Sequence, residues 1–138
     1  MRIRFKAWAR PELEASKFYR DNPEELKGKW IEEFVNKQNP IYLELGCGKG
    51  NFISQIAIQN SEINYIAIDL VDAMLGIAKR NVEETFFEAN REINNVILTR
   101  FDIERIGLIL GKEDNIKRIY INFCNPWPKG KHRKKRLT

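Results

Sequence analysis

The sequence predicts an α/β fold built on a doubly wound parallel sheet. Short apolar segments typical of buried strands alternate with longer segments whose apolar residues recur at helical spacing. A glycine-rich turn joins the first of these strands to a helix. The length of 138 residues suits one domain, and a composition of 43% hydrophobic and 31% charged residues is that of a globular protein. We therefore expect residues 1–138 to form a single domain.

The chain begins with an arm and a first helix. Residues 1–20 are rich in basic and aromatic side chains and predict a partly ordered arm. Asn22 and Pro23 predict a helix start, because asparagine caps helices and proline suits their first position. An apolar stripe carries this helix to about Lys37. Strands are then expected at residues 41–45, 64–69, 96–101 and 118–123, helices at 51–59 and 72–92, and a short segment of undecided type at 103–110.

The turn from Gly46 to Gly50 favours a nucleoside-binding site. Its glycines, Gly46, Gly48 and Gly50, permit a tight reversal and a close approach of the backbone to a ligand. Asp69 ends the next strand, 19 residues after Gly50, where nucleotide-binding folds place an acid that accepts both ribose hydroxyls. Two alternatives stay open: the glycines can be structural, and Asp69 can cap the following helix.

The spacing of the turn disfavours a nicotinamide dinucleotide. That fingerprint has glycines at its first, third and sixth positions, whereas the third glycine here is the fifth residue and Asn51 is the sixth. Glu44, two residues before the first glycine, suits the cationic amino group of S-adenosylmethionine and would repel a pyrophosphate. Asp102 follows the third strand and could accept from the adenine amino group, or be a solvated loop acid. We therefore expect S-adenosylmethionine as the cofactor.

The loop after the fourth strand should face the glycine turn. In doubly wound sheets ligands bind at the carboxyl ends of the strands, where the strand order reverses, and the first and fourth strands should flank that point. The loop reads Asn125-Pro126-Trp127-Pro128-Lys129. Its prolines restrict the backbone, and Trp127 offers a flat face on which a base could stack. The alternative is an ordinary proline-rich turn with a core tryptophan.

The net charge of +5 is concentrated near the end of the chain. Six positive charges lie within eight residues, on Lys129, Lys131, Arg133, Lys134, Lys135 and Arg136. The remaining 18 basic and 19 acidic residues nearly cancel. Next to the proline-rich loop, such a cluster favours contacts with the phosphates of a nucleic acid over a merely solvated charge run. We interpret residues 124–138 as a substrate loop with a basic tail.

Neither a membrane nor a metal is indicated by the sequence. No apolar run approaches the roughly 18 residues that span a bilayer. The first ten residues hold no apolar stretch, which argues against a secretory signal. Cys47 and Cys124, with His132 as the one histidine, show neither disulfide nor metal-ligand spacing. We expect two reduced thiols in a cytoplasmic protein without a metal site.

The whole chain resembles the bacterial tRNA (guanine-N7)-methyltransferases. The resemblance is carried by Arg2-Ile3-Arg4 with Trp8, the Leu43–Gly50 turn, the strand ending at Asp69, Asn95-Val96 leading to Asp102, and most specifically by residues 121–138. It implies a Rossmann-like sheet of the class I methyltransferase type. It also implies an enzyme that transfers a methyl group from S-adenosylmethionine to the N7 nitrogen of a guanine in tRNA.

The resemblance also assigns roles to individual residues. It implies that S-adenosylmethionine is bound by Glu44, Gly46, Gly48, Gly50, Asp69, Asp102 and Asn125. It implies that Lys129 touches the guanine-bearing substrate and that residues 131–136, His132 included, hold the tRNA. Because the N7 nitrogen has a lone pair and no proton, its attack on a methyl group needs alignment but no general base.

Two features depart from the family pattern. Asn125 stands where the family commonly has an aspartate taken as the catalytic residue, which leaves catalysis by Asn125 open. The family's last third, with the last strands of its sheet, would follow Thr138. We therefore expect a sheet without those strands, with Ile119, Ile121 and Phe123 partly exposed on an edge strand that recruits other copies.

Two other functions remain as alternatives. The first is a non-catalytic RNA-binding fragment or accessory subunit, which Asn125 and the absence of the family's last third would favour. The second is a methyltransferase acting on an amino group of DNA or protein. It is disfavoured because such enzymes place Asn-Pro-Pro-aromatic where this chain has Asn-Pro-Trp-Pro.

Overall fold

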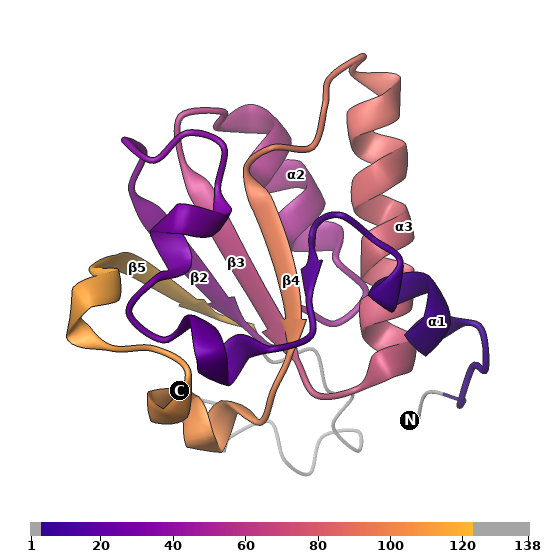
Figure 1. Ribbon diagram of the computed structural model, residues 1–138. Coiled ribbons are helices and arrows are strands. Elements are labelled where there is room, and N and C mark those ends of the chain that lie inside the picture. Colours follow the sequence, from indigo (N-terminus) through magenta and orange to yellow (C-terminus); the bar gives the residue numbers. More distant parts are fainter. Residues whose placement is uncertain (1–3, 123–138) are drawn as a thin grey trace, which may run out of the picture.

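The computed structural model describes residues 4–122 (Figure 1). The α-helices are α1 (Ala9–Glu14), α2 (Asn51–Gln59) and α3 (Asp72–Glu88). The strands are β1 (Tyr19–Arg20), β2 (Ile41–Leu45), β3 (Asn64–Asp69), β4 (Val96–Arg100) and β5 (Ile116–Ile121). Short 3-10 helices are η1 (Pro23–Leu26), η2 (Trp30–Glu33), η3 (Ile103–Leu108) and η4 (Lys112–Asp114).

The five strands form one parallel sheet in the order β1-β4-β3-β2-β5. β2 has β3 on one side and β5 on the other, so the strand order reverses between β2 and β5. These two are the first and fourth strands expected from the sequence. Figure 1 shows α2 and α3 on one face of this sheet and the 3-10 segments on the other. The predicted fold class, a doubly wound parallel α/β sheet, is therefore confirmed.

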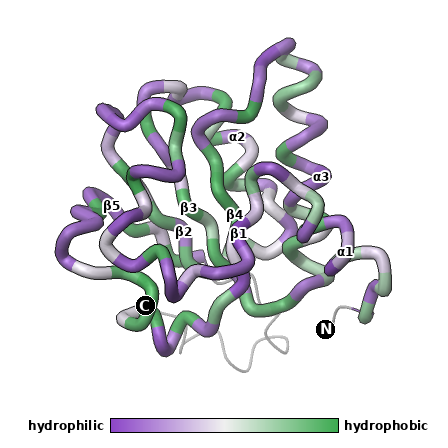
Figure 2. Tube along the Cα trace, in the orientation of Figure 1, coloured by the Kyte–Doolittle hydropathy of each residue, from purple (hydrophilic) through white to green (hydrophobic). Residues whose placement is uncertain are grey.

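Each face of the sheet has its own apolar core. Residues of α2 and α3, among them Ile53 and Val82, pack with Tyr65 and Leu98 of the strands. On the opposite face Trp30 packs in a second cluster with strand residues such as Leu43, Ile66 and Ile97. Figure 2 shows the interior strands as hydrophobic segments and the surrounding loops as hydrophilic ones. Burial on both faces explains why β2, β3 and β4 are mostly apolar at successive positions, with Glu44, Asn64 and Thr99 as buried polar exceptions.

Most element boundaries agree with the sequence-based prediction. The segments 41–45, 51–59 and 64–69 have the predicted type and bounds. The helix predicted at 72–92 ends earlier, at Glu88, and the strand predicted at 96–101 ends at Arg100. The fourth predicted strand begins and ends two residues earlier than expected, at Ile116 and Ile121.

The helix predicted from Asn22 to about Lys37 is wrong, because two 3-10 turns stand there. Gly28, with φ of +81°, breaks the helical path between them. The carboxylate of Asp114 accepts hydrogen bonds from the backbone N–H groups of Gly28 and Trp30, at 2.8 and 3.1 Å. Of the apolar residues in this segment, Leu26, Trp30 and Phe34 are nevertheless buried, whereas Val35 is 75% exposed, so the predicted apolar stripe marked the inward side chains only in part.

The predicted arm, residues 1–20, packs against the rest of the domain in the part that the structure describes, residues 4–20. α1 packs against α3, where Glu12 pairs with Lys79 at 2.9 Å and Arg80 at 2.7 Å. The guanidinium carbon of Arg80 lies 3.5 Å from the centroid of a Trp8 ring. A Cβ at Gly76 would lie 2.9 Å from that indole, so a glycine is needed for this approach. β1 then pairs with β4.

Within residues 4–122, none of the helices combines the length and the hydropathy that a membrane crossing requires.

Candidate functional site

The carboxyl ends of four strands bring the predicted acids to one edge of the sheet. β2 continues into Gly46, β3 ends at Asp69, β4 is followed by Asp102, and β5 is followed by Asn122. The register pairs Leu45 with both Ile68 and Ile121, which aligns these ends. This edge, at the point of strand reversal, is where parallel α/β sheets bind their ligands.

The three glycines of the turn all adopt the left-handed backbone region, with φ of +79°, +55° and +84° for Gly46, Gly48 and Gly50. A Cβ at Gly46 would lie 2.8 Å from the backbone oxygen of Asn122, and one at Gly50 would lie 2.7 Å from the Cα of Ala78. Two of the glycines are therefore required by the packing of the protein itself, as the structural interpretation of the turn held.

Asp69 is tied directly to the glycine turn. One of its carboxylate oxygens accepts from the backbone N–H of Gly48 at 2.8 Å, and the other accepts from Val71 at 3.1 Å. The second bond shapes the entry into α3, but Asp69 does not cap this helix as the alternative held, since the N-cap residue is Val71 and no side chain makes a cap hydrogen bond. A carboxylate can accept about four hydrogen bonds, so both oxygens retain capacity for a ligand.

α2 and α3 hold the remainder of the turn. The side-chain amide of Asn81 on α3 donates to the backbone oxygen of Lys49 at 2.7 Å. The hydroxyl of Ser54 on α2 donates to the backbone oxygen of Gly50 at 2.6 Å. The turn is thus fixed by side chains from two helices, which keeps its backbone in one arrangement before any ligand arrives.

Glu44 is the most unusual titratable group of this edge. It lies on β2 with 1% of its surface exposed. Its Oε2 accepts from the side-chain amide of Asn122 at 2.9 Å, whereas its buried Oε1 has no hydrogen-bond partner among the described residues. Burial raises the pKa of Glu44 to about 7, the Asn122 bond opposes that rise, and the charge of Asp69 adds to it. A cation placed beside Oε1 would satisfy it.

Asp102 lies at the same edge but bonds locally. Its Oδ1 accepts from the backbone N–H of Glu104 at 3.0 Å and so caps η3. This bond gives Asp102 a structural role that the sequence did not suggest. Contact with an adenine amino group stays a prediction.

A cavity of about 370 Å³ opens against the glycine turn. It is lined by Cys47, Gly48, Lys49, Asn51, Phe52, Met74 and Asn122. Gly48 was predicted as a site residue, and the others were not. Phe52 and Met74 fall within the helices predicted at 51–59 and 72–92. Their positions in the first turns of α2 and α3, directly after the carboxyl edge, were the signal available in the sequence.

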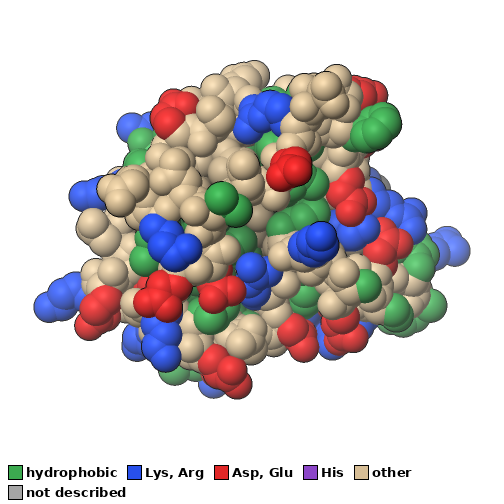
Figure 3. Space-filling model, turned by 45° about the horizontal axis from the view of Figure 1, so that its top comes forward, with side chains coloured by type: hydrophobic (Ala, Val, Ile, Leu, Met, Phe, Trp, Pro, Cys, Tyr) green, Lys and Arg blue, Asp and Glu red, His purple; other side chains and the backbone are tan. Residues whose placement is uncertain are grey.

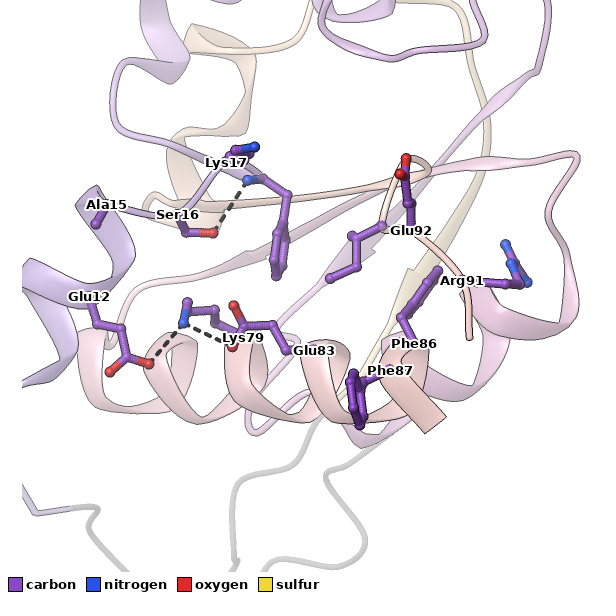
Figure 4. Close-up of a pocket in the computed structure, with 12 residues that line it drawn as sticks. Glu12, Ala15, Ser16, Lys17, Lys79, Glu83, Phe86, Phe87, Arg91 and Glu92 are labelled. Carbon is purple, nitrogen blue, oxygen red and sulfur yellow. Dashed lines mark hydrogen bonds and ion pairs between the residues drawn. The ribbon is translucent and has the colours of Figure 1, made fainter. Parts of the chain in front are cut away.

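A larger cavity, of about 670 Å³, lies between α1 and the later turns of α3 (Figure 4). Figure 4 shows the ammonium of Lys79 between Glu12 and Glu83, and both distances are 2.9 Å. The walls also include Ile93, which precedes β4, so this cavity extends toward the amino ends of the strands. Because these charges already pair with each other, the smaller cavity at the glycine turn is the better candidate site.

The remaining predicted site residues lie outside the described residues. They are Asn125, Lys129, Lys131, His132, Arg133, Lys134, Lys135 and Arg136. Cys124, Trp127 and the two prolines of the loop lie outside the described residues as well. On the described face drawn in Figure 3, acidic and basic side chains are intermixed. This mixture agrees with the near balance of charge outside the tail.

Comparison with known proteins places this site in a family. A family model described as "Putative methyltransferase" matches residues 38–138. The whole chain is 59% identical to a tRNA (guanine-N(7)-)-methyltransferase of Clostridium botulinum (strain Eklund 17B / Type B) and 58% identical to one of Clostridium beijerinckii. The chain spans 63% of the length of each of these relatives.

A solved structure described as "Structure of an Antibiotic Related Methyltransferase" is also similar, at 22% identity and a TM-score of 0.49, over 72% of this chain and 45% of that one. The family match covers the glycine turn, Asp69, Asp102 and the carboxyl edge as a whole. The chain therefore belongs to this methyltransferase family.

Proposed function

We propose that the chain transfers a methyl group from S-adenosylmethionine to the N7 nitrogen of a guanine in tRNA. The single observation that carries the donor half is the buried Glu44 carboxylate beside the glycine turn, with one oxygen unpartnered among the described residues. The acceptor half is supported by the relatives named tRNA (guanine-N(7)-)-methyltransferase, which match the chain along its full length.

The residues at the carboxyl edge fit this donor. When bound, S-adenosylmethionine supplies a methyl group activated on a sulfonium. Glu44 would hold its amino group, because an ammonium compensates a buried carboxylate. Asp69 would accept from the ribose hydroxyls, and Asp102 from the adenine amino group. The apolar side chains of Phe52 and Met74 offer packing surface in the cavity at the glycine turn, whose lining does not include Glu44, Asp69 or Asp102.

The acceptor side needs positioning more than acid–base chemistry. A guanine N7 carries a lone pair and no proton, so no residue has to remove one. Positioning alone can supply about 7–11 kcal/mol toward a barrier. We assign this task to Asn125 and Lys129, by resemblance, and phosphate binding to residues 131–136. An amide oxygen at position 125 offers a dipole where an aspartate would offer a full charge. A tRNA substrate also implies a cytoplasmic protein.

The test of the donor half is calorimetric titration of the chain with S-adenosylmethionine. We expect binding by the wild type, and binding at least about tenfold weaker for Asp69→Ala, because one bond to a charged group is lost. Asp69→Asn, which keeps an acceptor oxygen for the turn, separates loss of charge from loss of local structure. Asp21→Ala, at an exposed position, is the control. Unchanged affinity in a folded Asp69 variant would show that Asp69 does not contact the methyl donor.

The test of the acceptor half is mass analysis of tRNA nucleosides after incubation with labelled methyl donor. Label in 7-methylguanosine supports the proposal. Label on an exocyclic amino group would favour the amino-group alternative, and bound but unlabelled tRNA would favour an RNA-binding role. A fusion of the chain to the remaining third of the Clostridium botulinum relative is assayed beside it, because the chain spans 63% of that protein.

A further inference from the structure

We propose that Asn122 is a positioning residue of the donor site, one that anchors Oε2 of Glu44 and thereby keeps Oε1 available to the cationic group of the methyl donor. This inference rests on the donor half of the proposed function. Asn122 lines the cavity at the glycine turn and also reaches Glu44, so it joins the cavity to the buried carboxylate.

The backbone of Asn122 is held on two sides. Its N–H donates to the backbone oxygen of Leu45 at 3.1 Å, which extends the pairing of β5 with β2 by one residue. Its carbonyl oxygen occupies the space into which a Cβ at Gly46 would project, at 2.8 Å. From this fixed backbone the side-chain amide donates to Oε2 of Glu44 at 2.9 Å.

An amide suits this position because it donates without adding charge. A lysine or arginine beside Glu44 would neutralise the carboxylate and compete with a cationic ligand. An apolar residue would leave both oxygens buried without a bond, and the protonated form would then dominate. Asn122 stabilises the ionised form and leaves the negative charge for the ligand. Of the titratable groups around Glu44, Asp69 on β3 acts in the opposite sense.

The side chain of Asn122 can be changed while its backbone bond to β2 is kept. The bond that ties this residue to β2 uses its backbone N–H, and an alanine retains that bond. Asn122→Ala should therefore keep the pairing of β5 with β2 and change the ionisation and orientation of Glu44. A purely structural role would instead weaken every ligand of the cavity to the same degree.

The experiment compares two probes on the full chain. S-adenosylmethionine carries the amino group, and 5′-methylthioadenosine has the nucleoside part without it. For Asn122→Ala we expect about tenfold weaker binding of S-adenosylmethionine at neutral pH and unchanged binding of 5′-methylthioadenosine. We also expect the pH midpoint of S-adenosylmethionine binding to move upward. Asn60→Ala is the matched control. Asn60 follows the last residue of α2, at the end away from the glycine turn, and its side-chain amide donates to the backbone oxygen of Ile56 at 2.8 Å.

A double variant tests whether Asn122 acts through Glu44. In a Glu44→Gln background, Asn122→Ala should have little further effect, because coupled residues are not additive. Asn122→Ser, too short to reach Glu44, replaces the alanine variant if that one does not fold. Equal losses for both probes, full additivity with Glu44→Gln, or wild-type affinity in Asn122→Ala would each overturn the inference. A wild-type chain that binds neither probe would overturn the proposed function, and this inference with it.

Discussion

At the scale of single residues, the burial of Glu44 gives a physical reason why this side chain would favour the cationic ligand proposed above. A carboxylate with 1% exposure and one unpartnered oxygen among the described residues raises the free energy of the ligand-free protein. A cation that pairs with it recovers that free energy, whereas an anion such as a pyrophosphate adds repulsion. The preference for a cationic donor over a dinucleotide, inferred from the position of Glu44 in the sequence, thus gains a physical basis from its burial.

Donor binding should strengthen as the pH rises toward 7. Burial raises the pKa of Glu44 from near 4.5 to about 7, so the ligand-free protein holds a proton there that the unfolded chain has released. Between these two values, rising pH removes stability from the ligand-free protein. A donor ammonium, which stays charged below about 7.7, needs the ionised carboxylate. Its affinity should therefore fall by up to about tenfold for each pH unit below 7.

Calorimetry from pH 5.5 to 7, in buffers of different ionisation enthalpy, measures both the affinity and the proton released on binding. Glu44→Gln should bind more weakly and without this pH dependence. A flat profile for the wild type, with no proton release, would show that Glu44 does not meet the donor's amino group.

The sequence predicted which residues meet at the carboxyl edge of the sheet where strand order decides their position, but not where the strand register does; their roles in binding stay predictions. Glu44 and Asp69 could be predicted at one edge because carboxyl ends of parallel strands coincide. Asn122 was missed because the apolar pattern placed it inside the strand 118–123. The pairing of β5 starts at Ile116, opposite Ile41, and this register is a long-range contact that no local pattern contains.

At the scale of elements, local signals sufficed for α2, β2 and β3, whose bounds were predicted without error. The glycine turn separates two of these elements, and the apolar spacing changes clearly between them. The segment 22–37 has equally strong local signals for a helix, but it lies against η4. There the carboxylate of Asp114 accepts hydrogen bonds from two of its backbone N–H groups. A tertiary contact with a partner more than 80 residues away thus overrides helix propensity.

Asp114 should consequently be a major contributor to stability. It is 4% exposed and accepts from the backbone N–H groups of Gly28, Trp30 and Gly111, at 2.8, 3.1 and 2.8 Å. Asp114→Ala leaves these donors without their acceptor, and we expect the free energy of unfolding to fall by about 2–4 kcal/mol. Asp114→Asn, which keeps one acceptor oxygen, should lose less.

Urea unfolding followed by tryptophan fluorescence measures these changes, since Trp30 lies beside the site. Asp21→Ala, which removes an exposed carboxylate, is the control. A loss for Asp114→Ala no larger than that of the control would mean that other contacts hold the 3-10 segments.

At the scale of the whole molecule, the charge separates into a nearly neutral body and a basic tail. If about three tail cations reach phosphates, the affinity for tRNA should fall with salt at a log–log slope near −2 to −3. Changing Arg133, Lys134, Lys135 and Arg136 to alanine should flatten this slope. The same change at four exposed body lysines, Lys29, Lys37, Lys112 and Lys117, is the control. Salt-insensitive binding would indicate that the tail is a solvated charge run that does not contact phosphates.

The sheet has two unequal edges. β1, at one end, has two residues, whereas β5, at the other, has six and pairs with β2 alone among the described residues. Ile119 and Ile121 of β5 are 53% and 60% exposed, which confirms the expectation for these two residues, while Phe123 lies outside the described residues. Ile119 and Ile121 pair with Leu43 and Leu45 of β2, which belong to the apolar cluster on the face covered by the 3-10 segments. The apolar surface of this face therefore extends onto β5, where the two isoleucines are exposed.

This edge should cause the chain to self-associate. An exposed strand with unpaired backbone groups and large apolar side chains is a template for another copy, and lysines on such edges prevent pairing. We therefore expect the chain to form oligomers whose population grows with concentration, and the double change Ile119→Lys and Ile121→Lys to shift it to the monomer. Because both side chains are exposed, the double variant should keep the thermal stability of the monomer.

Sedimentation velocity over a range of concentrations distinguishes the two states. Phe87→Lys is the matched control, since Phe87 is 84% exposed on α3, away from the strand edge. If Phe87→Lys dissolved the oligomers as well, general surface hydrophobicity would be the cause and not the edge of β5. A wild-type chain that stays monomeric at every concentration would show that this edge is covered, and that the exposed isoleucines do not recruit a second copy.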